Sequence, residues 1–316
     1  MTLRFVVLGS AAGGGFPQWN CRCPVCDLAW KNDPRVKRRT QSSIAVETGA
    51  GRWTLFNASP DLRSQILATP LLQPTGLRET PIRSVVLTNG DVDHVDGLIT
   101  LRERSPLTVY ATSQISGILD ANPIFGVLAK DMVAREVVAL NKPFRIDDST
   151  IEFFGVPGKV PLYLETENLT IGDAGGDTVG VEITRDGTTL VYIPGCATVD
   201  AGVLARVDGA DALLFDGTVF EDDEMRQAGV GVKTGRRMGH VPISGEGGSL
   251  HAFDSVQVGQ KIYIHINNTN RILVDGSAER EAVEAAGWRV SEDGLEVALG
   301  GLASERTFED RGTTAA

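Results

Sequence analysis

The chain has 316 residues, 42% of them hydrophobic and 22% charged, which is the composition of a globular protein with a packed core. Its net charge of −11, with only the short basic run Lys37-Arg38-Arg39, argues against nucleic-acid binding. No run of about 18 apolar residues occurs, and the N-terminal apolar stretch is too short for a secretory signal. We therefore expect a cytoplasmic protein without a membrane span.

Short strands alternate with a few helices along the chain. The first apolar run predicts a buried strand that ends at a glycine-rich turn. The pair Asp186-Gly187, between two later runs, predicts a tight hairpin. The predicted strands cover residues 3–8, 43–47, 53–57, 84–88, 107–110, 136–140, 151–156, 179–184, 189–193, 212–216 and 261–266.

Three segments carry helix signals, namely residues 61–68, 200–207 and 278–286, the last with Ser277 as its expected N-cap. Two strand-rich halves with inserted helices, and no Pro/Ser-rich linker between them, predict one α/β domain in which helices sandwich two sheets (αββα). We expect this single domain to cover residues 1–305 and a flexible tail to follow at 306–316.

Three of the four cysteines, Cys21, Cys23 and Cys26, lie close together in the sequence. In a reducing compartment, clustered cysteines favour metal binding over a disulfide. Three thiolates and one further ligand form the closed tetrahedral site that zinc prefers, so the cluster predicts a structural zinc site. The alternative is a set of free buried thiols. The spacing alone does not identify the fourth ligand.

The stretch TNGDVDHVDGL follows an apolar run and holds Asp91, Asp93, His94 and Asp96 within six positions. Carboxylates and an imidazole this close together indicate a metal site. The stretch is similar to the pattern His-x-His-x-Asp-His. However, Asn89 and Asp91 stand where that pattern has its first two histidines.

The other histidines are His240, His251 and His265. His265 lies where an apolar run meets polar residues, His240 lies in a glycine-rich loop, and Cys196 comes just after another apolar run. Residues that open from strand ends into loops are where α/β folds place their chemistry, so these three join His94 as candidate site residues. We expect His251, in a segment of helical character, to be structural.

Seven segments together carry a specific resemblance that spans nearly the whole chain. They are VLGSAAGGGFPQWNCRCPVC, QSSIAV, NASPDLRSQI, TNGDVDHVDGLITLRE, YIPGC, MGHVPISG and YIHINNTN. With them the chain resembles the metallo-β-lactamase superfamily and, within it, the family of pyrroloquinoline quinone (PQQ) biosynthesis B proteins. The resemblance implies the metallo-β-lactamase fold, with two mixed sheets flanked by helices.

The resemblance also implies that one of two metal sites is lost. Superfamily members hold a first metal with three histidines, and here Asn89, Asp91 and Lys159 occupy those places. A lysine among the ligands would repel a metal ion, so this site is expected to be lost. The two-metal hydrolase mechanism, which needs ions about 3.5–4 Å apart, is thereby disfavoured.

The second superfamily site uses an aspartate, the adjacent histidine and a late histidine, which correspond here to Asp93, His94 and His265. Two histidines and one carboxylate form a facial triad with open positions, which suits non-haem Fe(II), although a lone zinc ion fits the same ligand types. The usual bridging aspartate is replaced by Cys196. Its role stays open between weak ligand, support of a ligand, and packing.

Three further roles follow from the resemblance. In phosphodiesterase-like relatives a histidine in such a glycine loop donates protons, which implies a catalytic role for His240. Those relatives complete the cysteine site with a histidine at the place where this chain has Asn268. Lys159, beside the metal, is expected to bind the carboxylates of a substrate.

The implied function is PQQ biosynthesis. Family members resemble an Fe(II)-dependent oxygenase that uses O₂ to hydroxylate the tyrosine ring of the Glu-Tyr diamino acid precursor, and other PQQ-pathway proteins are possible partners. One alternative is a carrier that moves PQQ or its precursor towards the periplasm. A third class is a mononuclear zinc hydrolase. The expected cofactors are Fe(II) at the active site and a structural zinc.

Overall fold

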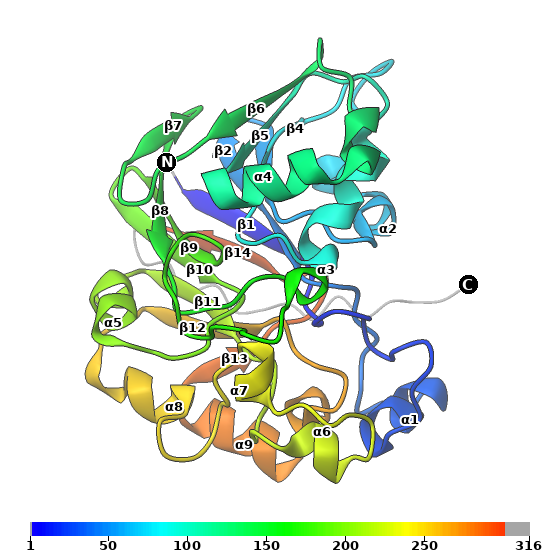
Figure 1. Cartoon of the computed structure of the whole chain (residues 1–316), viewed down its shortest axis with the longest axis vertical. Helices are drawn as coiled ribbons and strands as arrows, with labels where there is room; N and C mark the ends of the chain where they lie inside the picture. Colours follow the sequence, from blue (N-terminus) through cyan, green and yellow to red (C-terminus); the bar gives the residue numbers. More distant parts are fainter. Residues whose placement is uncertain (1, 301–316) are drawn as a thin grey trace.

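The computed structural model describes residues 2–300. Within them two seven-stranded sheets lie face to face, and helices cover the outer face of each (Figure 1). Both sheets contain parallel and antiparallel pairs. The expected αββα sandwich of two mixed sheets is therefore confirmed.

The first sheet has the strand order β14-β1-β2-β3-β4-β5-β6. Its strands from β3 onwards run parallel, so their carboxyl ends meet at one edge. The strands are β1 (Leu3–Gly9), β2 (Ser43–Gly49), β3 (Arg52–Phe56), β4 (Ile82–Val86), β5 (Leu107–Ala111), β6 (Val133–Val137) and β14 (Glu296–Leu299).

The second sheet has the order β13-β12-β11-β10-β9-β8-β7, with a parallel half from β10 to β13. β9 and β10 are joined by the predicted hairpin, in which Asp186 (φ 49°) and Gly187 (φ 78°) both adopt the left-handed conformation of a tight turn. The strands are β7 (Phe144–Ile146), β8 (Ser149–Gly155), β9 (Val179–Arg185), β10 (Thr188–Ile193), β11 (Ala212–Asp216), β12 (Gln260–Ile264) and β13 (Trp288–Val290).

Helices α2 and α4 flank the first sheet, and α5, α8 and α9 flank the second (Figure 1). The α-helices in the described part of the chain are α1 (Pro24–Trp30), α2 (Leu62–Ala68), α3 (Val92–Val95), α4 (Ser113–Ala121), α5 (Ala201–Val207), α6 (Glu224–Gln227), α7 (Gly235–Met238), α8 (Ser249–Ala252) and α9 (Ala278–Ala285). Short 3₁₀ helices cover Pro70–Leu72, Asp96–Leu101, Pro123–Val127, Leu162–Leu164, Phe253–Ser255 and Arg271–Leu273.

The strands are apolar on both faces because each sheet is covered on both sides. In β1, Phe5 and Val7 enter the core between the sheets, whereas Val6 and Leu8 pack beneath the helices of the first sheet. β11 does the same in the second sheet, where Leu214 faces the first sheet and its neighbours face the outer helices. This double burial is why these strands are continuous hydrophobic runs in the sequence.

The predicted helices are confirmed within one residue at each end, with Ser277 capping α9 through the backbone N–H of Arg280. The strand predicted at residues 136–140 is wrong in position, because β6 covers Val133–Val137. β6 is an edge strand with little buried surface. Its sequence therefore lacks the alternation of apolar and polar residues that predicts a strand. The single domain over 1–305 stays a prediction, and the tail at 306–316 lies outside the described residues. Among residues 2–300 no helix has the length and apolarity needed to cross a membrane.

Candidate functional site

The candidate metal ligands come together at the carboxyl ends of the parallel strands. Asp93 and His94 lie on α3, which follows β4, and His265 follows β12 of the other sheet. Ile266 N donates to Ser10 O, and Ala12 N donates to Ile266 O, each at 2.9 Å. These two hydrogen bonds join the segment after β12 to the segment after β1 and so connect the two sheets beside the site. The fold thus places residues 172 positions apart in contact.

Asp93, His94 and His265 form one compact group whose ligand atoms all lie within 4.8 Å of one another. The Oδ2 atom of Asp93 is 3.1 Å from His265 Nε2 and 3.9 Å from His94 Nε2. His94 is almost fully buried, and its Nε2 has no hydrogen-bond partner within the described residues. A buried ring nitrogen without a partner is costly unless another group binds it, and a metal ion fits that position.

His94 is held in the form that binds metals. Its Nδ1 lies 2.8 Å from Asn89 Oδ1, which only accepts, so Nδ1 carries the proton and Nε2 is left with its lone pair. Burial lowers the pKa of His94 to about 4, which keeps the ring neutral. Asn89 therefore fixes the tautomer and orientation of the His94 ring.

His265 is oriented by Thr218. The Thr218 hydroxyl donates to Asp216 Oδ1 at 2.6 Å and can accept from His265 Nδ1 at 2.8 Å, which leaves Nε2 of His265 facing Asp93. His265 itself has a left-handed backbone (φ 58°), which is uncommon for a residue other than glycine. Such a conformation persists where surrounding contacts fix it, and it turns the ring towards the site.

His240 joins the site through Asp216, a residue that the sequence reading missed. The fully buried Asp216 ends β11, and its Oδ2 accepts from His240 Nδ1 at 2.7 Å. Burial opposes ionisation of Asp216, but His240 and His265 outweigh it and hold its pKa below the usual range. The His240 ring stacks on His265 at 5.1 Å between centroids, and Asp216, His240 and His265 form a second group whose possible ligand atoms lie within 4.8 Å of one another. The sequence signal that could have indicated Asp216 is its position as a carboxylate at the carboxyl end of the strand predicted at residues 212–216.

Cys196 lies beside this hydrogen-bond network. Within residues 2–300 it belongs to none of the groups of side chains that could hold a metal ion. Its Sγ is 3.1 Å from the carbonyl oxygen of Thr198, and its backbone N–H donates to Asp216 Oδ2 at 2.9 Å. Burial, and then the charge of Asp216, raise the pKa of its thiol well above the usual range. Cys196 is therefore a neutral packing residue whose backbone helps to hold Asp216.

Lys159 lies near the site but is paired. Its Nζ is 3.0 Å from Glu165 Oε1, and both side chains are largely buried. Burial and the charge of Asp93 raise the pKa of Asp91, and Lys159 counteracts that rise. This part of the site thus combines the Asn89 amide that contacts His94, the carboxyl group of Asp91 and the Lys159 cation.

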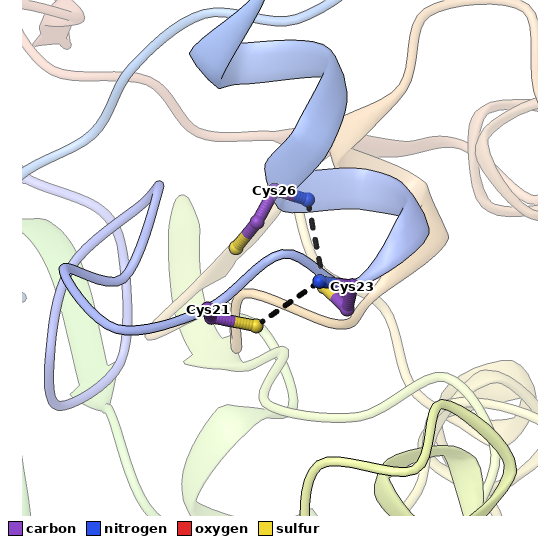
Figure 2. Close-up of side chains that lie close together, drawn as sticks. All are labelled: Cys21, Cys23 and Cys26. Carbon is purple, nitrogen blue, oxygen red and sulfur yellow. Dashed lines mark hydrogen bonds between the residues drawn. The ribbon is translucent and has the colours of Figure 1, made fainter.

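Cys21, Cys23 and Cys26 form a compact buried group (Figure 2). Cys23 caps the start of α1, where its Sγ accepts from Cys26 N at 3.5 Å, and Cys23 N donates to Cys21 Sγ at 3.3 Å. The hydrogen bond from Cys23 lowers the pKa of Cys26, although burial opposes this. The side-chain amide of Asn268 completes the group at 3.3 Å from the sulfur atoms of Cys21 and Cys26.

A second acid with an unusual pKa contacts the loop after Asn268. Glu224 on α6 accepts hydrogen bonds from Thr269 Oγ1 at 2.6 Å and from Phe220 N at 2.7 Å. Burial raises its pKa from 4.5 to about 7. Between these two pH values the folded protein keeps a proton that the unfolded chain releases, so its stability falls as the pH rises through this window.

We expect Glu224→Gln to stabilise the protein at pH 8 by about 3 kcal/mol, because it removes the cost of burying a charged carboxylate. Glutamine keeps the acceptor for Phe220 N and can donate to the Thr269 hydroxyl. At pH 5 the gain should nearly vanish, since wild-type Glu224 is then protonated in the folded state. Urea unfolding of both proteins at the two pH values measures this, and an equal difference at both would contradict it.

Comparison with known proteins identifies the family. The model of the β-lactamase superfamily domain matches residues 52–266. Coenzyme PQQ synthesis protein B of Methylorubrum populi is 56% identical over 94% of this chain and 100% of that protein. The protein of the same name from Rhizobium meliloti is 49% identical over 94% of this chain and 98% of its own.

Solved structures agree. The crystal structure of Zn²⁺-bound PqqB from Methylobacterium extorquens has a TM-score of 0.92 at 54% identity, and the match covers 93% of this chain and 99% of that one. A diphosphatase from the PhnP family, with a TM-score of 0.67 at 18% identity over 95% and 98% of the two chains, shares the fold alone. The chain has the metallo-β-lactamase fold and belongs to the coenzyme PQQ synthesis protein B family.

Proposed function

We propose that this chain is a non-haem Fe(II) oxygenase of PQQ biosynthesis, which uses O₂ to hydroxylate the tyrosine ring of the Glu-Tyr diamino acid precursor. The observation that carries the proposal is the unpartnered Nε2 of His94, grouped with Asp93 and His265. Two imidazoles and one carboxylate on one side of a position leave the other side open for a substrate and O₂. Fe(II) held there would pass electrons from an external reductant to O₂, which ring hydroxylation needs and which Zn²⁺ cannot do.

The surrounding residues favour one metal over two. Asn89 Oδ1 is engaged by His94, and Lys159 adds a positive charge beside Asp91. A second cation at this place would meet a positive charge where hydrolases of this fold have histidines. A two-metal clamp on a hydrolytic substrate is therefore disfavoured.

His240 is the proposed catalytic residue. Its Nδ1–H is held by Asp216, so Nε2 can accept the proton of a bound phenol or of the ring carbon undergoing hydroxylation. Asp216 stabilises the imidazolium that results. Burial of His94 and Thr218 at the base of the site excludes water from the ligand side.

The cysteine group is the proposed structural zinc site. Turning the Asn268 side-chain amide would place its oxygen, instead of its nitrogen, beside the three sulfur atoms. Cys21, Cys23, Cys26 and Asn268 would then surround a tetrahedral ion. This assigns to Asn268 the place that a histidine takes in phosphodiesterase-like relatives.

One other function has an observation in its favour. The solved relative is described as Zn²⁺-bound, which is consistent with a mononuclear zinc hydrolase. The other alternative is a carrier of PQQ or its precursor, which needs no oxygen-reactive metal. Both alternatives predict that O₂ is not consumed.

The test is incubation of Fe(II)-loaded protein, the diamino acid and a reductant under ¹⁸O₂, followed by mass spectrometry of the product. We expect labelled oxygen in the tyrosine-derived ring, and none when Zn²⁺ replaces Fe(II) in the active site. Unlabelled product would indicate hydrolysis or oxygen derived from water. No product with tight binding of the diamino acid would favour the carrier.

A further inference from the structure

One carboxylate near the site is shared by three cations. Glu165 Oε1 is 3.0 Å from Lys159 Nζ, and Glu165 Oε2 is 3.3 Å from Lys233 Nζ and 3.2 Å from the Nη2 of Arg237. Within residues 2–300 no second acidic side chain pairs with any of the three. The cluster therefore keeps an excess of positive charge in a protein whose net charge is −11.

The basic cluster, defined as Lys159, Lys233 and Arg237, borders the metal group. Arg237 lies on α7, three residues before His240. The side chain of Lys159 packs against Gly239, where an added Cβ would lie 3.1 Å from its Cγ, so the lysine runs along the loop that carries His240. On its other side, the Lys159 carbonyl accepts from Thr178 Oγ1, and Thr178 pairs with Asn89.

The cluster becomes more exposed with distance from the metal group. The Lys159 side chain is 11% exposed, Lys233 35% and Arg237 43%. Lys233 and Arg237 reach the same oxygen of Glu165, which leaves most of their N–H donors available. A planar guanidinium beside two ammonium groups is well suited to a carboxylate, and Glu165 shows that their donors converge at carboxylate spacing.

We propose that the basic cluster is a recognition site for a carboxylate of the substrate, and that Glu165 occupies it when no substrate is bound. The inference deepens the proposed function, because it assigns the substrate to polycarboxylated aromatic compounds, a class that includes the diamino acid and PQQ itself. The segment that carries Glu165 is pinned by the Tyr163 hydroxyl, which donates to Gly90 O at 2.6 Å, so the carboxylate is presented from beside the metal-binding stretch. Substrate binding would take two of the cations from Glu165 while Lys159 stays paired.

The experiment is calorimetric titration of Zn²⁺-loaded protein, which does not turn over, with PQQ and with the diamino acid. The double variant Lys233→Met/Arg237→Gln should weaken binding by about tenfold or more, because it removes two charge-assisted contacts. Arg236→Gln is the matched control. This variant removes a cation from α7, the helix that also carries Arg237. The Nη2 atom of Arg236 lies near Gly247 O instead of Glu165, so the variant should bind PQQ like wild type.

Two more measurements complete the test. PQQ trimethyl ester, which keeps the rings but lacks the charges, should bind the wild type and the double variant equally. Glu165→Gln should bind PQQ more tightly than wild type, because the internal competitor is gone, and weaker binding would overturn the role of Glu165. The recognition site is overturned if the double variant binds as well as wild type, if Arg236→Gln loses as much, or if wild type binds neither compound. A negative ¹⁸O₂ result leaves these binding differences intact, so the two proposals fail separately.

Discussion

Cys23→Ser is expected to release zinc from the cysteine group and to lower the melting temperature by roughly 5–10 °C. Cys23 does three things at once. It is a proposed ligand, it caps α1, and its sulfur lies 3.7 Å from the Asn268 carbonyl oxygen, beyond β12. Zinc at this place would therefore join the N-terminal loop to the segment that carries His265. Losing one ligand releases the ion that would hold the sulfur atoms together, and this loosens both segments.

The measurement is elemental analysis of protein purified without chelator or added metal, together with thermal unfolding. Cys196→Ser is the matched control. This variant also changes a buried cysteine, but the Cys196 sulfur contacts Thr198 O and not the cysteine group. The variant should therefore keep stoichiometric zinc even if its melting temperature changes. If Cys23→Ser retains both zinc and the wild-type melting temperature, the cysteine group is not a zinc site.

The strands and the candidate ligands could be predicted because their signals are local. β10, β11 and β12 are apolar on both faces, and the polar residues that follow them are where the site forms. His94 and His265 were recognisable from their own short segments. The edge strands β7, β13 and β14 were missed, because three or four residues with a single neighbouring strand leave too short a pattern.

The support of the site could not be predicted, because it depends on pairs that are distant in the sequence. Asp216 is 24 residues from His240, and neither sequence segment indicates that the two side chains form a hydrogen bond. Lys159 looked like a free cation for the substrate, but the structure pairs it with Glu165 and adds two more cations from the loop around α7. Ligand types follow from short segments, whereas protonation states and charge balance follow from the fold.

His94→Ala is expected to abolish binding of the active-site metal and to reduce product formation to background. The imidazole contributes a buried ring nitrogen that has no hydrogen-bond partner, and the variant leaves only Asp93 and His265 in the group. Two ligands on one side of the ion hold it too weakly to resist exchange with water. The zinc at the cysteine group should remain, because the two sites share no ligand.

A milder variant tests the same prediction with less risk that a folding defect explains the loss of metal. Asn89→Ala keeps the His94 ring but removes the acceptor 2.8 Å from its Nδ1, so metal affinity should fall by about 10–100-fold without being lost. His251→Ala removes an exposed histidine on α8 and should match wild type in metal content and activity. The measurements are Fe(II) titration and the rate of ¹⁸O incorporation. Product formation by His94→Ala at the wild-type rate would show that Asp93, His94 and His265 do not form the reactive site, and a loss equally large in His251→Ala would show that the effect is not specific to it.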